Sequence, residues 1–118
     1  MSRTALLVMV AAIASCNAGT VDDVRTRKLG GGGTVRDLQL IVPRGRALAF
    51  VAQPMEGQET LKQDIALESR DETVAKIYGT EEMNQFVVVG VANGSTSLDV
   101  IDSTGGSTGV EFTVSVTP

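Results

Sequence analysis

Apolar and polar residues alternate most regularly near the end of the chain. Val110, Phe112, Val114 and Val116 are each separated by one polar residue. A period of two places successive side chains on opposite faces of a β-strand. This run therefore predicts a strand with one buried face and one solvated face.

Six earlier segments carry similar strand patterns, and no stretch longer than one or two turns has helical spacing. These predicted strands cover residues 37–42, 46–53, 63–67, 74–78, 86–91 and 96–101. Loops are expected at 54–60, 79–85 and 103–109. Seven short strands separated by turns are typical of an antiparallel β-sandwich. The predicted fold is therefore all-β, with about seven strands in a single domain over residues 34–118.

The first residues have the three parts of an export signal. Arg3 gives a positive start, residues 5–14 are apolar, and small residues precede Cys16. As a helix this apolar stretch would span about 15 Å, roughly half of a bilayer's hydrocarbon core. Residues 1–15 are therefore predicted to be a signal peptide and not a transmembrane helix.

The end of this segment, Ile13-Ala14-Ser15-Cys16, resembles a bacterial lipobox. The resemblance implies cleavage before Cys16 and attachment of lipid to its sulfur. The membrane would then be a partner, and Asn17, where Asp would retain a lipoprotein at the inner membrane, favours the outer membrane or cell surface. Two alternatives remain, namely an ordinary secretion signal with a chance cysteine, and no export at all.

Residues 16–33 are polar and rich in glycine, and four consecutive glycines stand at 30–33. Glycine runs leave the backbone free in many conformations. We expect a flexible tether with a reach of about 20–25 Å. Its cluster of Arg25, Arg27 and Lys28 could touch anionic lipid headgroups weakly, although a solvated run of charges is the better explanation.

Composition excludes several function classes. The formal net charge is −4, and an acidic chain is repelled by nucleic-acid phosphates. Histidine is absent, so the usual general base and the commonest transition-metal ligand are missing. Aromatic residues are 3% of the chain, which predicts an aliphatic core and no aromatic-lined site for a small-molecule substrate.

No catalytic or metal-binding pattern emerges from the remaining polar residues. The adjacent acids at 22–23, 71–72 and 81–82 suit solvated turns better than an acid/base couple. Asp99 and Asp102 could give two oxygens to Ca²⁺, which needs six or more. We therefore expect no enzymatic activity, no cofactor and no metal site.

Three segments carry a resemblance to a known family. They are residues 71–77, with an acidic turn before Val-Ala-x-Ile, residues 90–98, with Gly-x-Ala-x-Gly-x-Thr, and Val-Ser-Val at 114–116. The chain resembles the bacterial immunoglobulin-like group 2 (BIG2) module of invasin- and intimin-type adhesins, other surface proteins and phage virions. The resemblance covers residues 34–118 and implies an immunoglobulin-like sandwich. It departs from the family at Leu67, where Trp is common, and in holding one module where tandem copies are usual.

These observations predict a non-catalytic, lipid-anchored envelope protein that displays one immunoglobulin-like domain for structural or protein-interaction purposes. An alternative is a surface module of a phage virion, which would keep its N-terminus. Another is an adhesin-type binding domain that grips a protein through an edge strand or the three predicted loops. The sequence names no contact residues and no partner.

Overall fold

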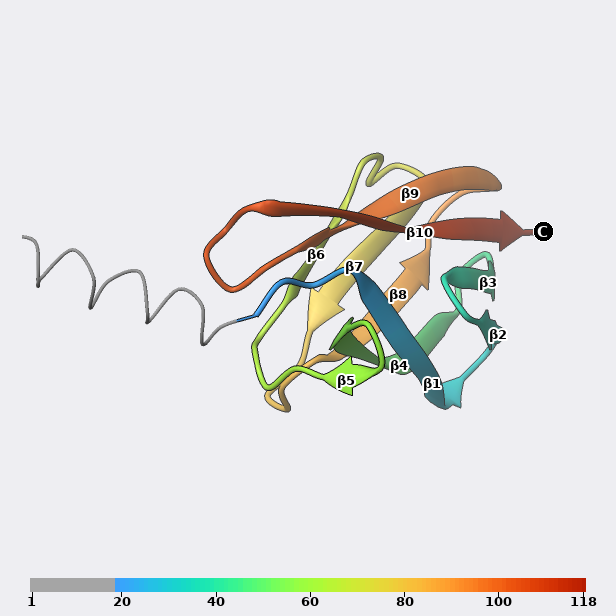
Figure 1. Cartoon of the computed structure of the whole chain (residues 1–118). Helices are drawn as coiled ribbons and strands as arrows, with labels where there is room; N and C mark the ends of the chain where they lie inside the picture. Colours follow the sequence, from blue (N-terminus) through green and yellow to red (C-terminus); the bar gives the residue numbers. More distant parts are fainter. Residues whose placement is uncertain (1–18) are drawn as a thin grey trace, which may run out of the picture.

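The protein is a sandwich of two β-sheets (Figure 1), known from a computed structural model that describes residues 19–118. The predicted signal peptide at 1–15 and the predicted lipidation site Cys16 lie outside the described residues. Within the described range no helix has the length and hydropathy needed to cross a bilayer. The predicted all-β class is confirmed.

Ten strands form the two sheets, and strands that are neighbours in a sheet are often distant in sequence. Sheet A has the order β1 (Asp23–Gly31), β4 (Ala47–Glu56), β8 (Gln85–Gly90), β7 (Ala75–Gly79), with β5 (Glu59–Thr60) paired to the end of β4. Sheet B has the order β2 (Thr34–Arg36), β3 (Gln39–Pro43), β10 (Ser107–Thr117), β9 (Gly94–Ile101), β6 (Ala66–Ser69). Adjacent strands are antiparallel except β3 and β10, which are parallel.

The core lies between the sheets and is mostly aliphatic. Phe50 of sheet A sits at its centre, with ring centroids 6.0 Å from Phe86 and 5.8 Å from Phe112. The predicted one-sided burial of the last strand is confirmed for Phe112, Val114 and Val116. All seven predicted strands are present, and β1, β2 and β5 are additional.

The predicted flexible tether is wrong over its described part. β1 pairs with β4 from Asp23 opposite Met55 to Gly31 opposite Leu48. Val24 of β1 is 4% exposed and belongs to the core. As an edge strand with few apolar residues, β1 has no period-two signal, yet its backbone hydrogen bonds hold it in the sheet.

The glycine run marks the crossing from sheet A to sheet B. Gly31 has φ of 92°, and a Cβ there would lie 2.2 Å from the carbonyl oxygen of Ala47. Gly33 has φ of 115°, and its Cβ would lie 2.2 Å from the carbonyl oxygen of Ile41. Both positions exclude a side chain, so these glycines fix a tight crossing and do not loosen the chain.

One predicted loop is wrong, and the Asn-Gly pair at 93–94, a pair that favours tight hairpin turns, lies in a different kind of connection. The predicted loop at 54–60 is largely the hairpin of β4 and β5, closed by Leu61 N donating to Pro54 O at 2.9 Å. Asn93 and Gly94 do not form a hairpin turn, because β8 and β9 belong to opposite sheets. The Asn-Gly pair instead lies in a connection that crosses the sandwich.

Candidate functional site

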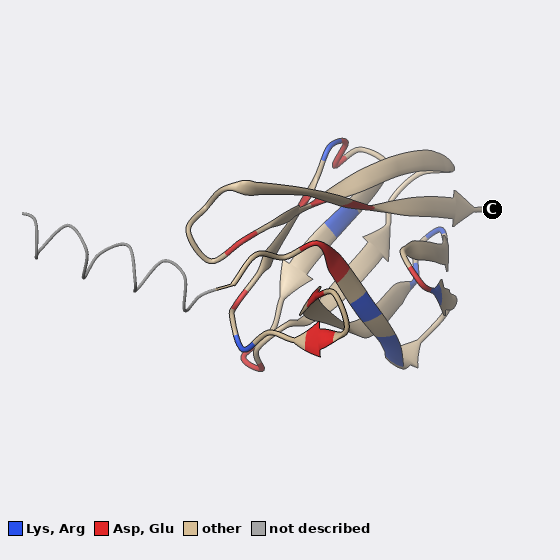
Figure 2. Ribbon diagram, viewed as in Figure 1, with Lys and Arg blue, Asp and Glu red and all other residues tan. Residues whose placement is uncertain are grey.

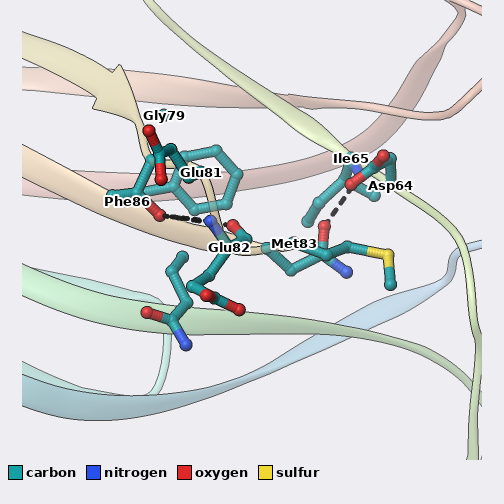
Figure 3. Close-up of a pocket in the computed structure, with 10 residues that line it drawn as sticks. Asp64, Ile65, Gly79, Glu81, Glu82, Met83 and Phe86 are labelled. Atoms are coloured by element: carbon teal, nitrogen blue, oxygen red, sulfur yellow. Dashed lines mark hydrogen bonds between the residues drawn. The ribbon is translucent and has the colours of Figure 1, made fainter.

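The turn between β7 and β8 borders a hollow of about 230 Å³. Figure 3 shows Glu81 and Glu82 from this turn and Asp64 from the segment before β6 around it. All three acids are exposed. The described residues include no group of three or more acids, cysteines or histidines placed to hold a metal ion. The hollow thus combines carboxylates with open solvent and supplies no obvious chemistry.

Hydrogen bonds of Asn84 connect this turn to residues 61–65, the segment between β5 and β6. Its side-chain oxygen accepts the N–H of Ile65 at 2.9 Å, and its amide nitrogen donates to Gln63 O at 2.9 Å. Its own carbonyl accepts from Ala52 N at 2.9 Å, and its φ is 59°. Asparagine tolerates this left-handed conformation better than most residues. Asn84 therefore has a structural role in the wall of the hollow.

A second hollow, of about 330 Å³, opens between β6 and β7. Leu67, Ile77 and Glu72 line it, and Leu67 is 7% exposed. This is the position where the resembled family often carries Trp. The leucine side chain leaves this space between the two strands unfilled.

Arg70 neutralises two acids on the outer face of sheet B. Its guanidinium contacts Asp99 at 2.6 Å and Glu111 at 2.7 Å, and these two acids lie opposite each other on β9 and β10. The hydrogen bond from Arg70, assisted by its charge, lowers the pKa of Asp99 below its ordinary 3.8. A lowered pKa makes Asp99 a weaker base, which suits an ion pair and not proton transfer.

Asp102 organises the turn that follows β9. Its Oδ1 accepts the hydroxyl of Thr104 at 2.6 Å and the N–H of Gly106 at 3.0 Å. Both bonds lower the pKa of Asp102, and the bond from the Thr104 hydroxyl has the larger effect. The two acids considered as Ca²⁺ ligands therefore have separate structural partners, and the predicted loop at 103–109 is partly the start of β10.

The residues that carry the family resemblance occupy constrained positions. Asp71 accepts the N–H of Thr73 at 3.0 Å through its side chain, and its carbonyl accepts from Val74 N at 3.1 Å, which closes the predicted turn. Gly90 is buried, and a Cβ there would lie 2.9 Å from Pro43 O. Gly94 has φ of 143°, and β9 begins at this residue.

The basic cluster expected in the tether lies on β1. Figure 2 shows acidic residues at the start of β1 and basic residues farther along it. Arg25 donates to Gln58 at 3.1 Å, and Lys28 donates to Gly33 O at 2.8 Å. The cluster is thus part of the folded domain and not of a free segment.

No family model matches the sequence, and no curated protein matches it. The fold is similar to domains 4 and 5 of the S-layer protein SbsC, with a TM-score of 0.52 and 15% identity. That match covers 80% of this chain and 54% of the solved chain, so this chain spans about half of it. A longer crystal structure of the S-layer protein rSbsC matches at a TM-score of 0.49 and 16% identity, covering 78% of this chain and 13% of that one. At these identities the likeness establishes the fold alone.

Proposed function

We propose that the protein is a non-catalytic lipoprotein of the bacterial envelope that presents one immunoglobulin-like BIG2-type domain to a protein partner. The main support is the place of the resembling residues in the fold. Asp71 closes a turn through its side chain, and Gly90 stands where a side chain would meet backbone. The turn uses the hydrogen-bond acceptor at residue 71, and the close approach of the backbone favours glycine at residue 90.

The proposal that the protein is non-catalytic is supported by the direction of the pKa shifts of its carboxyl groups. The described carboxyl groups with shifted pKa values, Asp99 and Asp102, are shifted downward by structural hydrogen bonds. A general acid at neutral pH needs the opposite shift. The fold also agrees with that of surface-layer domains, which is compatible with a role at the cell surface.

Because β1 belongs to the fold, the segment between Cys16 and the domain is shorter than the predicted tether of residues 16–33. Val21 is 4% exposed, so the folded part begins about five residues after Cys16. Five residues reach at most about 18 Å when fully extended. A lipid on Cys16 would therefore hold the sandwich close to the membrane surface.

The intact mass of the protein from its natural source tests the anchor. A mass of residues 16–118 plus lipid is expected, and globomycin, which blocks lipoprotein signal cleavage, should make the precursor accumulate. Cys16→Ser should abolish both effects, whereas Ser15→Ala should leave them unchanged. An unmodified mass beginning at Met1 or Ser2 would refute the anchor and favour the virion alternative.

A further inference from the structure

The outer face of sheet A is apolar across its central strands. In β4, Leu48 and Phe50 are fully buried and point inward, so the alternating residues Ala47, Ala49 and Val51 point outward. Residues directly opposite on paired strands share a face. The outward residues of the neighbouring strands are Gln85, Val87 and Val89 on β8 and Lys76 and Tyr78 on β7.

The outer face of sheet B is polar in comparison. Its β9 and β10 strands present Ser95, Ser97, Thr113 and Ser115 outward. A sandwich needs one apolar face per sheet, and a solvated outer face is normally polar. The apolar outer face of sheet A is therefore not required by the fold, and such patches often mark binding surfaces.

Cations lie at both edges of this face. Arg25 and Arg27 point outward on β1, opposite Gln53 and Val51, and Lys76 points outward on β7. No ion pair of the described chain involves any of the three cations. On the strands of this face the outward acid is Asp23, at the start of β1 beyond Arg25, and the exposed Glu81 and Glu82 lie in the turn at the end of β7. Between Ala47 and Val51 of β4, the charged outward residues of the paired strands are thus cations.

We propose that the outer face of sheet A docks an acidic protein, which lays an apolar strip across β4 and β8 and places carboxylates against Arg27 and Lys76. This inference rests on the interaction role proposed above and names its surface and the chemistry of its partner. Opposite charges at the rim select the partner and speed its association, while apolar contact at the centre supplies affinity.

A second copy of this chain is a poor occupant of the face. When two such faces stack with their strands aligned, the edge strands β1 and β7 of one copy lie over those of the other, so cations of the two copies gather at the same rim.

A membrane surface fits less well than a protein. Side chains that insert into the interface of a bilayer are typically large and aromatic. The apolar residues of this face are valine and alanine, together with Tyr78, which is 52% exposed. A flat face of small β-branched side chains matches another protein surface packed at about 10 Å.

Site-specific photo-crosslinking of the full-length protein in cells of its natural source tests the proposal. Tyr78→p-benzoylphenylalanine places the probe on the outer face of sheet A at an exposed aromatic position, where the added benzoyl group points into solvent. Thr113→p-benzoylphenylalanine is the control on the outer face of sheet B. We expect one discrete protein adduct from position 78 and none from 113, with an acidic and apolar crosslinked peptide identified by mass spectrometry.

Charge reversal makes the test specific. Arg27→Glu combined with Lys76→Glu should lower the yield of the adduct about tenfold, whereas Arg36→Glu on sheet B should leave it unchanged. A lipid adduct, a homodimer, equal yields at 78 and 113, or insensitivity to charge reversal would overturn the proposal. If these failures occur while Cys16 is still lipidated, only the surface assignment falls and the anchor stands.

Discussion

The side-chain oxygen of Asn84 accepts the backbone N–H of Ile65 at 2.9 Å, and through this bond the turn before β8 holds the segment before β6. Asn84→Ala removes this bond and the one to Gln63 O, and it also places alanine at a φ of 59°. Leaving buried backbone groups without partners should lower the free energy of unfolding by about 2–4 kcal/mol. Urea denaturation measures the change.

Two further variants separate the causes of that loss. Asn84→Gly keeps the positive φ but not the hydrogen bonds, so most of the loss should persist. Asn93→Ala alters an exposed asparagine and should change stability by less than about 0.5 kcal/mol. If Asn84→Gly were as stable as the parent, the strain of alanine and not the hydrogen bonds would explain the effect.

The glycine crossing gives a sharp comparison between adjacent residues. Gly31→Ala places a Cβ against the carbonyl of Ala47 and should lower the free energy of unfolding by about 2 kcal/mol or more. At Gly30 a Cβ would meet nothing within 4 Å, so Gly30→Ala should be neutral or stabilising by about 0.5 kcal/mol. Thermal denaturation distinguishes the two, and equal behaviour would restore the flexible tether.

The pKa of Asp99 should respond to Arg70 alone. Its folded pKa lies below its ordinary 3.8, so the folded state binds a proton less readily than the unfolded state. The stabilisation is complete above the unfolded pKa and is lost as the pH falls through the folded one. Carboxyl NMR titration of Arg70→Gln should show the pKa of Asp99 rising, with Asp102 unchanged as an internal control. A rise at both residues would indicate general unfolding.

The hollow beside Leu67 should accept a larger side chain. Leu67→Trp can fill the space between β6 and β7, and the added apolar burial should raise stability by about 1 kcal/mol. Leu98→Trp is the matched control, because Leu98 is fully buried and lines neither of the two hollows. Overpacking there should lower stability by about 1–3 kcal/mol. Chemical denaturation measures the free energy of unfolding of both variants. An equal loss of stability in the two would mean that the hollow is closed in solution.

The strands that the sequence predicts are those with a two-residue period, such as β10 with Phe112 and Val114 inward. β1 lacks this signal because Val24 is the single buried residue among its nine, so no apolar residue recurs two positions later on the inward face. β2 and β5 have 3 and 2 residues and are too short to show a period. These three strands are defined by backbone pairing with neighbouring strands, and the alternation of their own side chains does not predict them.

Local chemistry predicted the turn at Asp71 but could not predict contacts between distant strands. The ion pair of Arg70 with Asp99 and Glu111 depends on β6, β9 and β10 being neighbours in sheet B. Asn93-Gly94 favours a turn but does not say whether the flanking strands pair or cross to opposite sheets. Every side chain in residues 47–51 is apolar, which suits a strand covered on both faces, but the apolar neighbours of this segment on β8 follow only from the pairing of the strands.

The parallel pairing of β3 with β10 has a consequence for the order of folding. β3 forms from the first half of the chain, yet one of its two neighbours, β10, is made of the last residues. During synthesis β3 and β9 each keep an open edge until residues 107–117 emerge, and contacts so distant in sequence form slowly. The edge of β3 that faces β10 therefore stays open from the synthesis of Pro43 until residues 107–117 emerge, and a chaperone would be most useful in that period.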